Sequence, residues 1–276
     1  MVFQNRVEAG RLLAKQLRGY AGRNDVIVLG IPRGGVPVAF EVAMALKAPL
    51  DIFLSRKLGV PGQEELAFGA IASGDIRVLD RHLVEGLNIS EQEIDQITKT
   101  VETELERRER VYRGNRSPLQ VEGKTVLLID DGIATGSSMR AAIRALRQMR
   151  PARIVVAVPV APFHTCKLLR SEADELICIQ EPEFFYAIGQ FYDDFSQVTD
   201  EEVTELLRRA AQQIGPPTAP VTPAATGTVE DASSESSPAS DAPGMRSKVK
   251  EEIAMPSIPA RGGRATAFAG AEEAKH

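Results

Sequence analysis

The stretch Val126 to Met139, VLLIDDGIATGSSM, combines an apolar run, two adjacent acids and a turn of small residues. The apolar run predicts a buried strand, and the residues that follow the turn have the period of a helix. The turn therefore places backbone N–H groups and hydroxyls at a helix N-terminus, where the helix dipole favours an anion such as phosphate. Asp130 and Asp131 would repel that phosphate unless they accept hydrogen bonds from sugar hydroxyls or hold a hard cation such as Mg²⁺. This order of groups predicts a pocket for a phosphorylated sugar.

The rest of the first 213 residues alternates short apolar runs with stretches of helical period. The runs are rich in Val and Ile and apolar on both faces, which is typical of parallel strands covered on each side. The predicted strands are 26–31, 50–54, 125–130, 153–160 and 175–179, and the predicted helices are 4–20, 35–47, 137–150, 163–172 and 199–213. Thr199 is the expected N-cap of the last helix. The fold class that this rhythm predicts is α/β, an open, mostly parallel sheet with helices on both faces.

About 70 residues between the second and third sheet strands carry structure of their own. Two apolar runs, 65–72 and 76–80, flank Ser73-Gly74-Asp75 and predict a hairpin. A long charged helix follows, with Ser90 as N-cap and Glu93 at the capping-box position. An insertion of this kind at the carboxyl edge of a parallel sheet is where lids are placed, so we expect a hairpin/helix lid.

The end of this long helix allows two interpretations. Arg113 and Arg116 flank Gly114-Asn115, where a lid could hinge. In the simpler alternative, the arginines of the helix complement its C-terminal end and pair with its own glutamates. The arginines concerned are Arg107, Arg108, Arg110 and Arg113, and the glutamates are Glu102, Glu104, Glu106 and Glu109.

Composition excludes several classes of protein. A formal net charge of −5 lacks the basic excess that non-specific nucleic-acid binding usually needs. Cys166 and Cys178 form no CxxC pair and the three histidines are scattered, so we expect neither a disulfide framework nor structural zinc. No apolar stretch is long enough to span a bilayer and the first residues are charged, so a cytoplasmic protein without membrane association is expected.

The last part of the chain has a different composition. Eight of the seventeen prolines lie beyond Gly215, and Phe268 is the only aromatic residue there. Such a segment cannot bury enough apolar surface to offset its conformational entropy. We therefore expect one folded domain over 1–213 and a disordered tail rich in Pro, Ala and Ser over 214–276.

The order of strand, Asp-Asp, three residues, Thr-Gly and hydroxyl residues resembles the ribose-phosphate motif of the type I phosphoribosyltransferases, which use phosphoribosyl pyrophosphate (PRPP). The resemblance implies that Asp130 and Asp131 hold the ribose hydroxyls, with Mg²⁺ nearby. It also implies that the turn residues hold the 5-phosphate. These residues are Ala134, Thr135, Gly136, Ser137 and Ser138. Two other phosphate motifs are absent, because no GxxxxGK[ST] occurs and GIPRGG is not GxGxxG.

A second glycine-rich turn follows the first strand, in GIPRGGVPVAF. Gly34 and Gly35 permit backbone conformations closed to other residues, and the Arg33 guanidinium suits bidentate phosphate contact. In the family this position is the pyrophosphate loop, where a strained or cis non-proline peptide often occurs, and Arg33-Gly34 matches it. Taken alone, the turn is equally compatible with an ordinary glycine-rich connection.

The segment after the second strand, SRKLGVPG (residues 55–62), resembles a stretch of the adenine phosphoribosyltransferases, with one residue fewer between Gly and Pro. The resemblance implies that Arg56 or Lys57 stabilises the departing pyrophosphate. The alternative is a solvated pair of cations at a strand end. Ala72 stands where the adenine enzymes have an acid, so the resemblance does not extend to an adenine acceptor.

The densest aromatic cluster is EPEFFYAIGQFYDDF, residues 181–195. Its order loosely resembles that of the hypoxanthine-guanine enzymes. This implies that Phe184, Phe185 or Tyr186 stacks on a flat acceptor, and that Asp193 or Asp194 lies near the Mg²⁺ on pyrophosphate. The alternative is a hydrophobic plug over the open end of the sheet.

As a whole, the resemblance implies a Mg²⁺-dependent transferase that moves the phosphoribosyl group of PRPP to the nitrogen of a nucleobase-like heterocycle and releases pyrophosphate. It also implies a hood formed by the C-terminal part of the domain, and a homodimer is compatible with it. The alternative function is a PRPP-binding regulatory protein without catalysis, since a site can persist while chemistry is lost.

Overall fold

The computed structural model describes residues 1–215 except residues 61, 75, 115 and 117, and it does not describe the side chains of residues 64 and 65. Of the predicted tail, 214–276, all but the first two residues lie outside the described residues, as does Asn115 of the predicted hinge.

A five-stranded sheet with the order β2-β1-β6-β7-β8 forms the centre of the fold, and all its pairings are parallel. Its strands are β1 (Val26–Gly30), β2 (Leu50–Ile52), β6 (Thr125–Ile129), β7 (Arg153–Val160) and β8 (Glu175–Gln180). Each coincides with a predicted run to within a few residues. Strands β1 and β6 lie side by side in the centre of the sheet, so the loops that follow them leave from the same edge.

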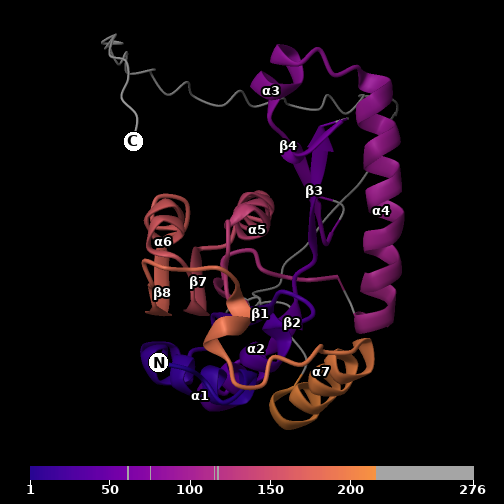
Figure 1. The fold of residues 1–276 in the computed structure, drawn as a ribbon. Coiled ribbons are helices and arrows are strands. Elements are labelled where there is room, and N and C mark those ends of the chain that lie inside the picture. The colour runs from indigo at the N-terminus through magenta and orange to yellow at the C-terminus, as the bar shows by residue number, and fades with distance from the viewer. Residues whose placement is uncertain (61, 75, 115, 117, 216–276) are drawn as a thin grey trace, which may run out of the picture. The chain divides into compact units, whose positions relative to one another are not determined.

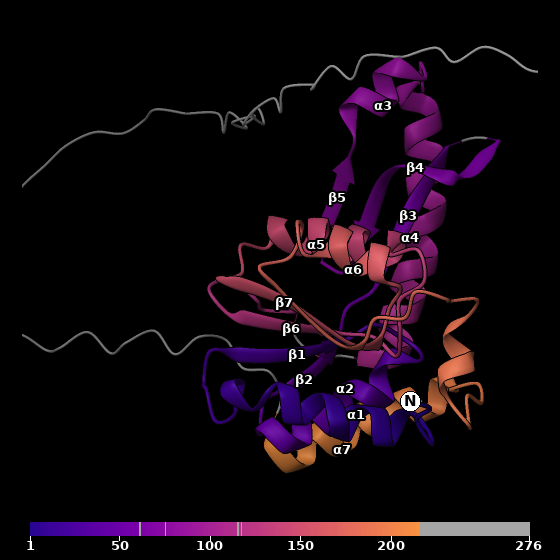
Figure 2. The same cartoon turned by 60° about the vertical axis from the view of Figure 1, so that its left-hand side comes forward.

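Helices cover both faces of this sheet (Figures 1 and 2). Alternate strand residues point to opposite faces: Val26 and Val28 belong to one core, and Ile27 and Leu29 to the other. Helices α1 (Arg6–Gln16), α2 (Gly35–Leu46) and α7 (Asp200–Ile214) cover the first face, and α5 (Ser137–Gln148) and α6 (Phe163–Leu169) cover the second. Short 3₁₀ helices span Arg18–Tyr20 and Ile188–Phe191. As predicted, Thr199 caps α7, in a capping box with Glu202.

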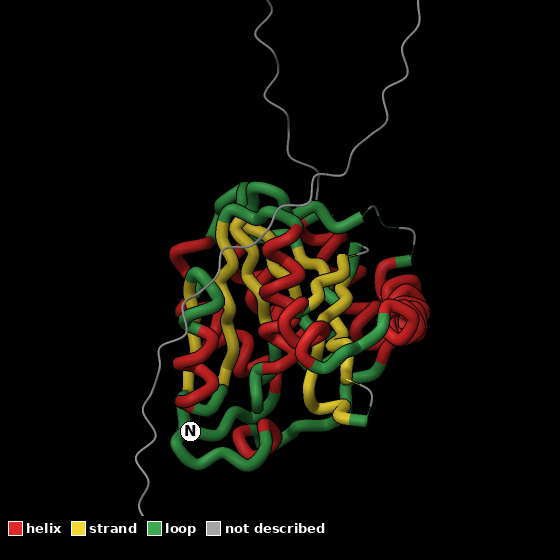
Figure 3. The backbone as a smooth tube through the Cα atoms, turned by 90° about the horizontal axis from the view of Figure 1, so that it is seen from above, coloured by secondary structure: helices red, strands yellow, loops and turns green. Residues whose placement is uncertain are grey.

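The insertion forms a second sheet with the antiparallel order β3-β4-β5. Its elements are β3 (Ser55–Val60), β4 (Gln63–Ala72), β5 (Ile76–Leu79), α3 (Arg81–Gly86) and α4 (Glu91–Arg113). The predicted hairpin is the β4–β5 pair, although Asp75 in its turn is not among the described residues. The capping box of Ser90 and Glu93 begins α4 as predicted. Figure 3 looks down the axis of α4, which lies beside β3 and β4.

One strand of this region was not predicted. Residues 55–60, for which no element was predicted, form strand β3, paired with β4 from Ser55↔Ala72 to Val60↔Gln63. The segment carries two cations and a glycine, which favour a loop when taken alone. It is a strand because its partner buries Leu58 and Val60 against it.

The C-terminal end of α4 is held to the central sheet. Arg113 is buried and donates to both carboxylate oxygens of Asp51 in β2, at 3.1–3.3 Å, and to Glu109 at 2.9 Å. Arg107 and Arg108 both pair with Glu104. Arg107, Arg108 and Arg113 therefore pair with glutamates of their own helix. The contact of Arg113 with Asp51 also ties the helix to the central sheet, which the sequence did not indicate.

Among the helices of the described residues, none combines the length and the apolar character that crossing a membrane would need.

Candidate functional site

The turn after β1 (residues 31–35) and the turn after β6 (residues 130–138) touch each other at one edge of the sheet. A Cβ on Gly34 would lie 2.0 Å from Oδ2 of Asp131, and one on Gly35 would lie 2.8 Å from Cα of Asp130. Distances this short leave no space for a side chain. The two glycines are therefore required for the close approach of the two turns.

A cis peptide bond that does not precede proline lies in the first turn. It joins Pro32 to Arg33, one residue before the Arg33–Gly34 bond that the resemblance indicated. Gly34 already has helical backbone angles (φ −59°, ψ −33°) as the N-cap of α2.

The two aspartates have different surroundings. Asp131 is buried, and its Oδ2 accepts a hydrogen bond from Nε of Arg6 at 2.8 Å. The Arg6 guanidinium also donates to the Ser196 carbonyl at 2.7 Å and lies 3.9 Å over the ring of Phe195. Asp131 is thus engaged within the protein. Both acids were predicted to hold the ribose hydroxyls, and in the structure one of them, Asp131, forms an ion pair with Arg6.

Asp130 accepts a hydrogen bond from the backbone N–H of Asp131 at 2.9 Å. Burial, and then the negative charge of Asp131, raise the pKa of Asp130 well above its usual range. A carboxyl group in this position is costly to keep charged unless a cation or a set of hydroxyl donors meets it. Of the two acids, Asp130 is therefore the one whose carboxyl is costly to ionise.

The turn of residues 134–138 presents small side chains and backbone N–H groups at the start of α5. Gly136 caps the helix with φ +81°, and the Thr135 and Ser137 hydroxyls lie 3.2 Å apart. The side chains of Ala134, Thr135, Ser137 and Ser138 are exposed. The turn is supported from behind by buried Thr165 at the start of α6, whose hydroxyl donates to the Ala134 carbonyl at 2.8 Å. The turn is thus open to solvent and held in shape, as an anion site at a helix N-terminus requires.

A cavity of about 350 Å³ lies next to Arg33, and we call it the arginine pocket. Its lining residues are Pro32, Arg33, Arg107, Arg108, Tyr112 and Asp200. Three guanidinium groups therefore face one cavity, two of them from α4 and one from the turn after β1. Asp200 is the pocket's acid, 3.6 Å from Nη1 of Arg33. It accepts a hydrogen bond from the Tyr112 hydroxyl at 2.6 Å.

The predicted pair Arg56 and Lys57 lies elsewhere. Both are on β3, and neither belongs to the lining of the arginine pocket. Arg56 is exposed and Lys57 half-buried. Their position follows from the strand that the sequence did not indicate, because side chains on a paired strand point in directions fixed by the pleat.

The aromatic segment after β8 is divided between two roles. Phe184 and Tyr186 are 80% and 89% exposed. Phe185 stacks on Phe191 with ring centroids 5.5 Å apart. Tyr192 is buried between Phe3 and Phe195, and its hydroxyl donates to the Asp131 carbonyl at 2.5 Å. Tyr192 and Phe195 therefore belong to a hydrophobic plug. Phe184 and Tyr186 leave their rings exposed to solvent.

Of the residues with a predicted metal role, Asp193 stands apart. It is exposed, and within the described ranges it does not join Asp130 and Asp131 in a group whose ligand atoms all lie within 4.8 Å of one another. Its backbone N–H donates to the Phe3 carbonyl.

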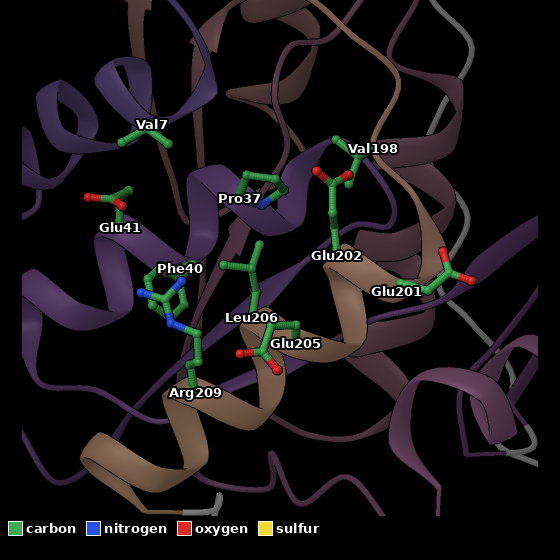
Figure 4. A pocket seen from close by; sticks show the side chains of 10 residues that line it. All are labelled: Val7, Pro37, Phe40, Glu41, Val198, Glu201, Glu202, Glu205, Leu206 and Arg209. Atoms are coloured by element: carbon green, nitrogen blue, oxygen red, sulfur yellow. The ribbon is translucent and has the colours of Figure 1, made fainter.

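A larger cavity, of about 530 Å³, lies between α1, α2 and α7 (Figure 4). Its lining is apolar and acidic, and its one cation, Arg209, lies 4.9 Å over the ring of Phe40. A phosphorylated ligand would meet several carboxylates there. The electrostatics therefore favour the arginine pocket as the anion site despite its smaller volume.

Several residues of the site were not found by sequence reasoning. Arg6, Thr165 and Tyr192 each contact the turn after β6 from segments at least 27 residues away. No motif indicates such contacts. Arg107 and Arg108 were identified as helix charges, but their position in a pocket depends on where the insertion folds.

Comparisons with known proteins agree with this geometry. The model of the family described as "Phosphoribosyl transferase domain" matches residues 3–196. Over 209 residues the chain is 43% identical to Rv0571c of Mycobacterium tuberculosis, whose name describes it as a candidate phosphoribosyl transferase. This match covers 76% of the chain and 47% of the relative, so the chain spans about half of that protein's length.

Two further matches complete the comparison. The crystal structure of TT1426 from Thermus thermophilus has 40% sequence identity and a TM-score of 0.69, and the match covers 76% of this chain and 99% of that one. "Bifunctional protein PyrR" of Brevibacillus brevis is 28% identical over 137 residues, which covers 44% of this chain and 76% of that protein.

Proposed function

Because the chain belongs to the phosphoribosyl transferase family, we propose that it transfers the 5-phosphoribosyl group of PRPP to a nitrogen atom of a nucleobase-like heterocycle, with release of pyrophosphate. The observation that carries this proposal is the contact between the turn after β1 and the turn after β6 at one sheet edge, where Gly35 lies against Asp130.

The two ends of PRPP have separate candidate sites. The exposed turn at the start of α5, which includes Thr135 and Ser137, fits the 5-phosphate. The ribose would lie over Asp130, whose carboxylate can accept hydrogen bonds from its hydroxyls. The pyrophosphate would then reach Arg33 and the arginine pocket, where guanidinium groups bind phosphate in a bidentate manner.

Asp200, the acid of the arginine pocket, is placed so that a ligand can replace it as the partner of Arg33. Burial, followed by the hydrogen bond to Asp200, raises the pKa of Tyr112 to about 12, so its hydroxyl stays protonated at neutral pH and remains a donor to that carboxylate. Arg33 is only 3.6 Å from the same carboxylate and 39% exposed. An incoming pyrophosphate can therefore take Arg33 from Asp200, while Tyr112 continues to satisfy the acid.

The residues present are compatible with Mg²⁺. This ion is usually held by one or two carboxylates together with substrate phosphates, and Asp130 is a carboxyl beside a candidate phosphate turn with an electrostatic need for a cation. Asp130, with Asp131 behind it, would hold the ion near the ribose. When bound, Mg²⁺ would neutralise charge on the departing pyrophosphate.

The chemistry assigned to the protein is mainly positioning. As the bond to pyrophosphate breaks, the anomeric carbon gains oxocarbenium character, and the acceptor nitrogen attacks it from the opposite side. Arg33, Arg107 and Arg108 would stabilise the leaving group. The acceptor would stack on Phe184 or Tyr186, which expose their rings beyond β8. Water must be excluded from the carbocation, and α4 with the second sheet is the candidate lid.

The test is pyrophosphate release from PRPP and Mg²⁺ in the presence of a panel of purine and pyrimidine bases. Release with one acceptor supports the proposal and identifies the substrate. PRPP binding in calorimetry without turnover across the panel would support a regulatory protein instead. No PRPP binding would contradict both functions.

A matched pair of variants tests the arginine pocket. Arg107→Gln removes a guanidinium from the pocket, and Arg110→Gln removes an exposed one from the same helix outside it. Loss of a charge-assisted hydrogen bond of about 1.5–3 kcal/mol weakens PRPP binding about 10- to 100-fold in the first variant. Equal effects in both variants would mean that the pocket is not the pyrophosphate site.

A further inference from the structure

Two cysteines and a glutamate meet on the α6 side of the sheet, and none of the three belongs to either turn. The Sγ atoms of Cys166 and Cys178 and a carboxylate oxygen of Glu181 all lie within 4.8 Å of one another. Within the described ranges this is the one group of three or more His, Cys, Asp or Glu side chains so arranged. Cys166 is on α6, Cys178 on edge strand β8, and Glu181 follows that strand. We call this group the thiol cluster.

The thiol cluster is partly enclosed and has polar neighbours. Cys166 is fully buried, and Cys178 and Glu181 are half-buried, so one side of the cluster remains reachable from solvent. The Cys178 thiol donates to the Gln180 carbonyl at 3.0 Å, and Arg170 forms an ion pair with Glu181. Two thiolates and a carboxylate carry three negative charges, which a divalent cation and the Arg170 guanidinium would balance.

We propose that Cys166, Cys178 and Glu181 bind one thiophilic divalent metal ion of the zinc class. Zn–S distances of about 2.3 Å and Zn–O distances of about 2.0–2.2 Å place the ligand atoms of a tetrahedral site roughly 3.5–4 Å apart, within the observed limit of 4.8 Å. Thiolates favour zinc over Mg²⁺ or Ca²⁺, which prefer oxygen ligands. Three protein ligands leave the fourth position to water, on the solvent side.

This proposal departs from the expectation of no structural zinc. That expectation depended on the absence of a CxxC pair, because Cys166 and Cys178 are 12 positions apart. Strand β8 runs back beside α6, and this brings the two thiols together. The proposal does not depend on the transferase activity.

The position of the cluster gives a bound ion a structural consequence. Cys166 follows Thr165, the residue that supports the turn before α5 through the Ala134 carbonyl. An ion held by α6 and β8 together would fix Thr165 against that turn. Metal binding should therefore raise the thermal unfolding temperature of the chain.

The test uses the full chain, reduced, freed of metal and titrated with Co²⁺ alone, then with Zn²⁺ alone. We expect one equivalent of Co²⁺, a thiolate-to-cobalt absorption band in the near ultraviolet, its loss on adding Zn²⁺, and a higher unfolding temperature with Zn²⁺. Cys178→Ser should abolish the band. Glu181→Gln should weaken Zn²⁺ binding by more than the roughly 10- to 100-fold typical of losing an outer-sphere partner.

Two controls separate loss of a metal ligand from a general effect of substitution on charge or folding. Glu183→Gln, an exposed acid two residues further on, should leave binding unchanged, and circular dichroism of each variant checks that it is folded. The proposal is overturned if the wild-type chain takes up no Co²⁺, or if folded Cys178→Ser binds it with the same band. It is also overturned if the thiols form a disulfide with each other even in the presence of Zn²⁺ and reductant.

Discussion

Replacing Asp130 by Asn should stabilise the protein and weaken PRPP binding. In the unfolded chain this carboxyl ionises near pH 4, and in the folded chain its pKa is raised by burial and by Asp131. Between these two values the folded state binds more protons than the unfolded state, so the free energy of unfolding falls as pH rises. Above the folded pKa the carboxyl is ionised in both states, and the full cost of its charge in the folded state lowers the free energy of unfolding. Asn has no such penalty, and its side-chain oxygen can still accept the hydrogen bond from the Asp131 N–H.

Asp131→Asn is the matched control, because it should lower the free energy of unfolding where Asp130→Asn raises it. Asp131→Asn removes the charge that faces Arg6 at 2.8 Å, where the two side chains are only 9–11% exposed. Loss of this charge-assisted hydrogen bond should cost about 1.5–3 kcal/mol. Removal of the Asp130 charge should instead raise the free energy of unfolding at pH 7.5. For a domain of this size, 1 kcal/mol corresponds to about 2–4 °C in unfolding temperature.

The assay is thermal unfolding of both variants and the wild type from pH 4 to pH 8, with PRPP calorimetry at pH 7.5. The gain of Asp130→Asn should be largest at pH 7.5 and become small near pH 4, where the folded carboxyl is protonated and the unfolded one is about half protonated. A destabilised Asp130→Asn, or a gain that does not change with pH, would refute the assignment of a raised pKa to the Asp130 carboxyl.

Three further changes test the rest of the structure. Gly34→Ala should lower the free energy of unfolding by about 1–3 kcal/mol, because its Cβ would overlap the Asp131 carboxylate, and Gly19→Ala, with open space around it, should have little effect in the same denaturation experiment. Thr165→Val should cost only about 1 kcal/mol of stability but measurably weaken PRPP binding, since it removes the hydrogen bond that supports the turn before α5; unchanged affinity would make that support irrelevant. Deleting residues 216–276 should leave the unfolding temperature nearly unchanged, and a large decrease in calorimetry would contradict the composition argument.

The central fold could be predicted from sequence because its signals are local. Each strand of the parallel sheet is a short run apolar on both faces, and each cap is set by neighbours, as Thr199 and Glu202 show. Strand β3 could not be predicted in this way. Its identity depends on pairing with β4, and a segment with two cations and a glycine has no strand pattern of its own.

The site was predictable only where the chain carries a contiguous motif. The two turns are such motifs, and adjacent parallel strands bring them together. The partner of Asp131 was not predictable, because Arg6 lies 125 positions away and has an ordinary place in an amphipathic helix. The arginine pocket likewise depends on the position of α4, which is set by long-range contacts such as that of Arg113 with Asp51.

The most direct test of the account is a crystal structure of the protein with PRPP and Mg²⁺. It should show the 5-phosphate on the backbone N–H groups before α5, the ribose hydroxyls at Asp130 and the pyrophosphate against Arg33 in the arginine pocket. PRPP bound elsewhere, for example in the cavity between α1, α2 and α7, or bound without contact to Asp130, would contradict it.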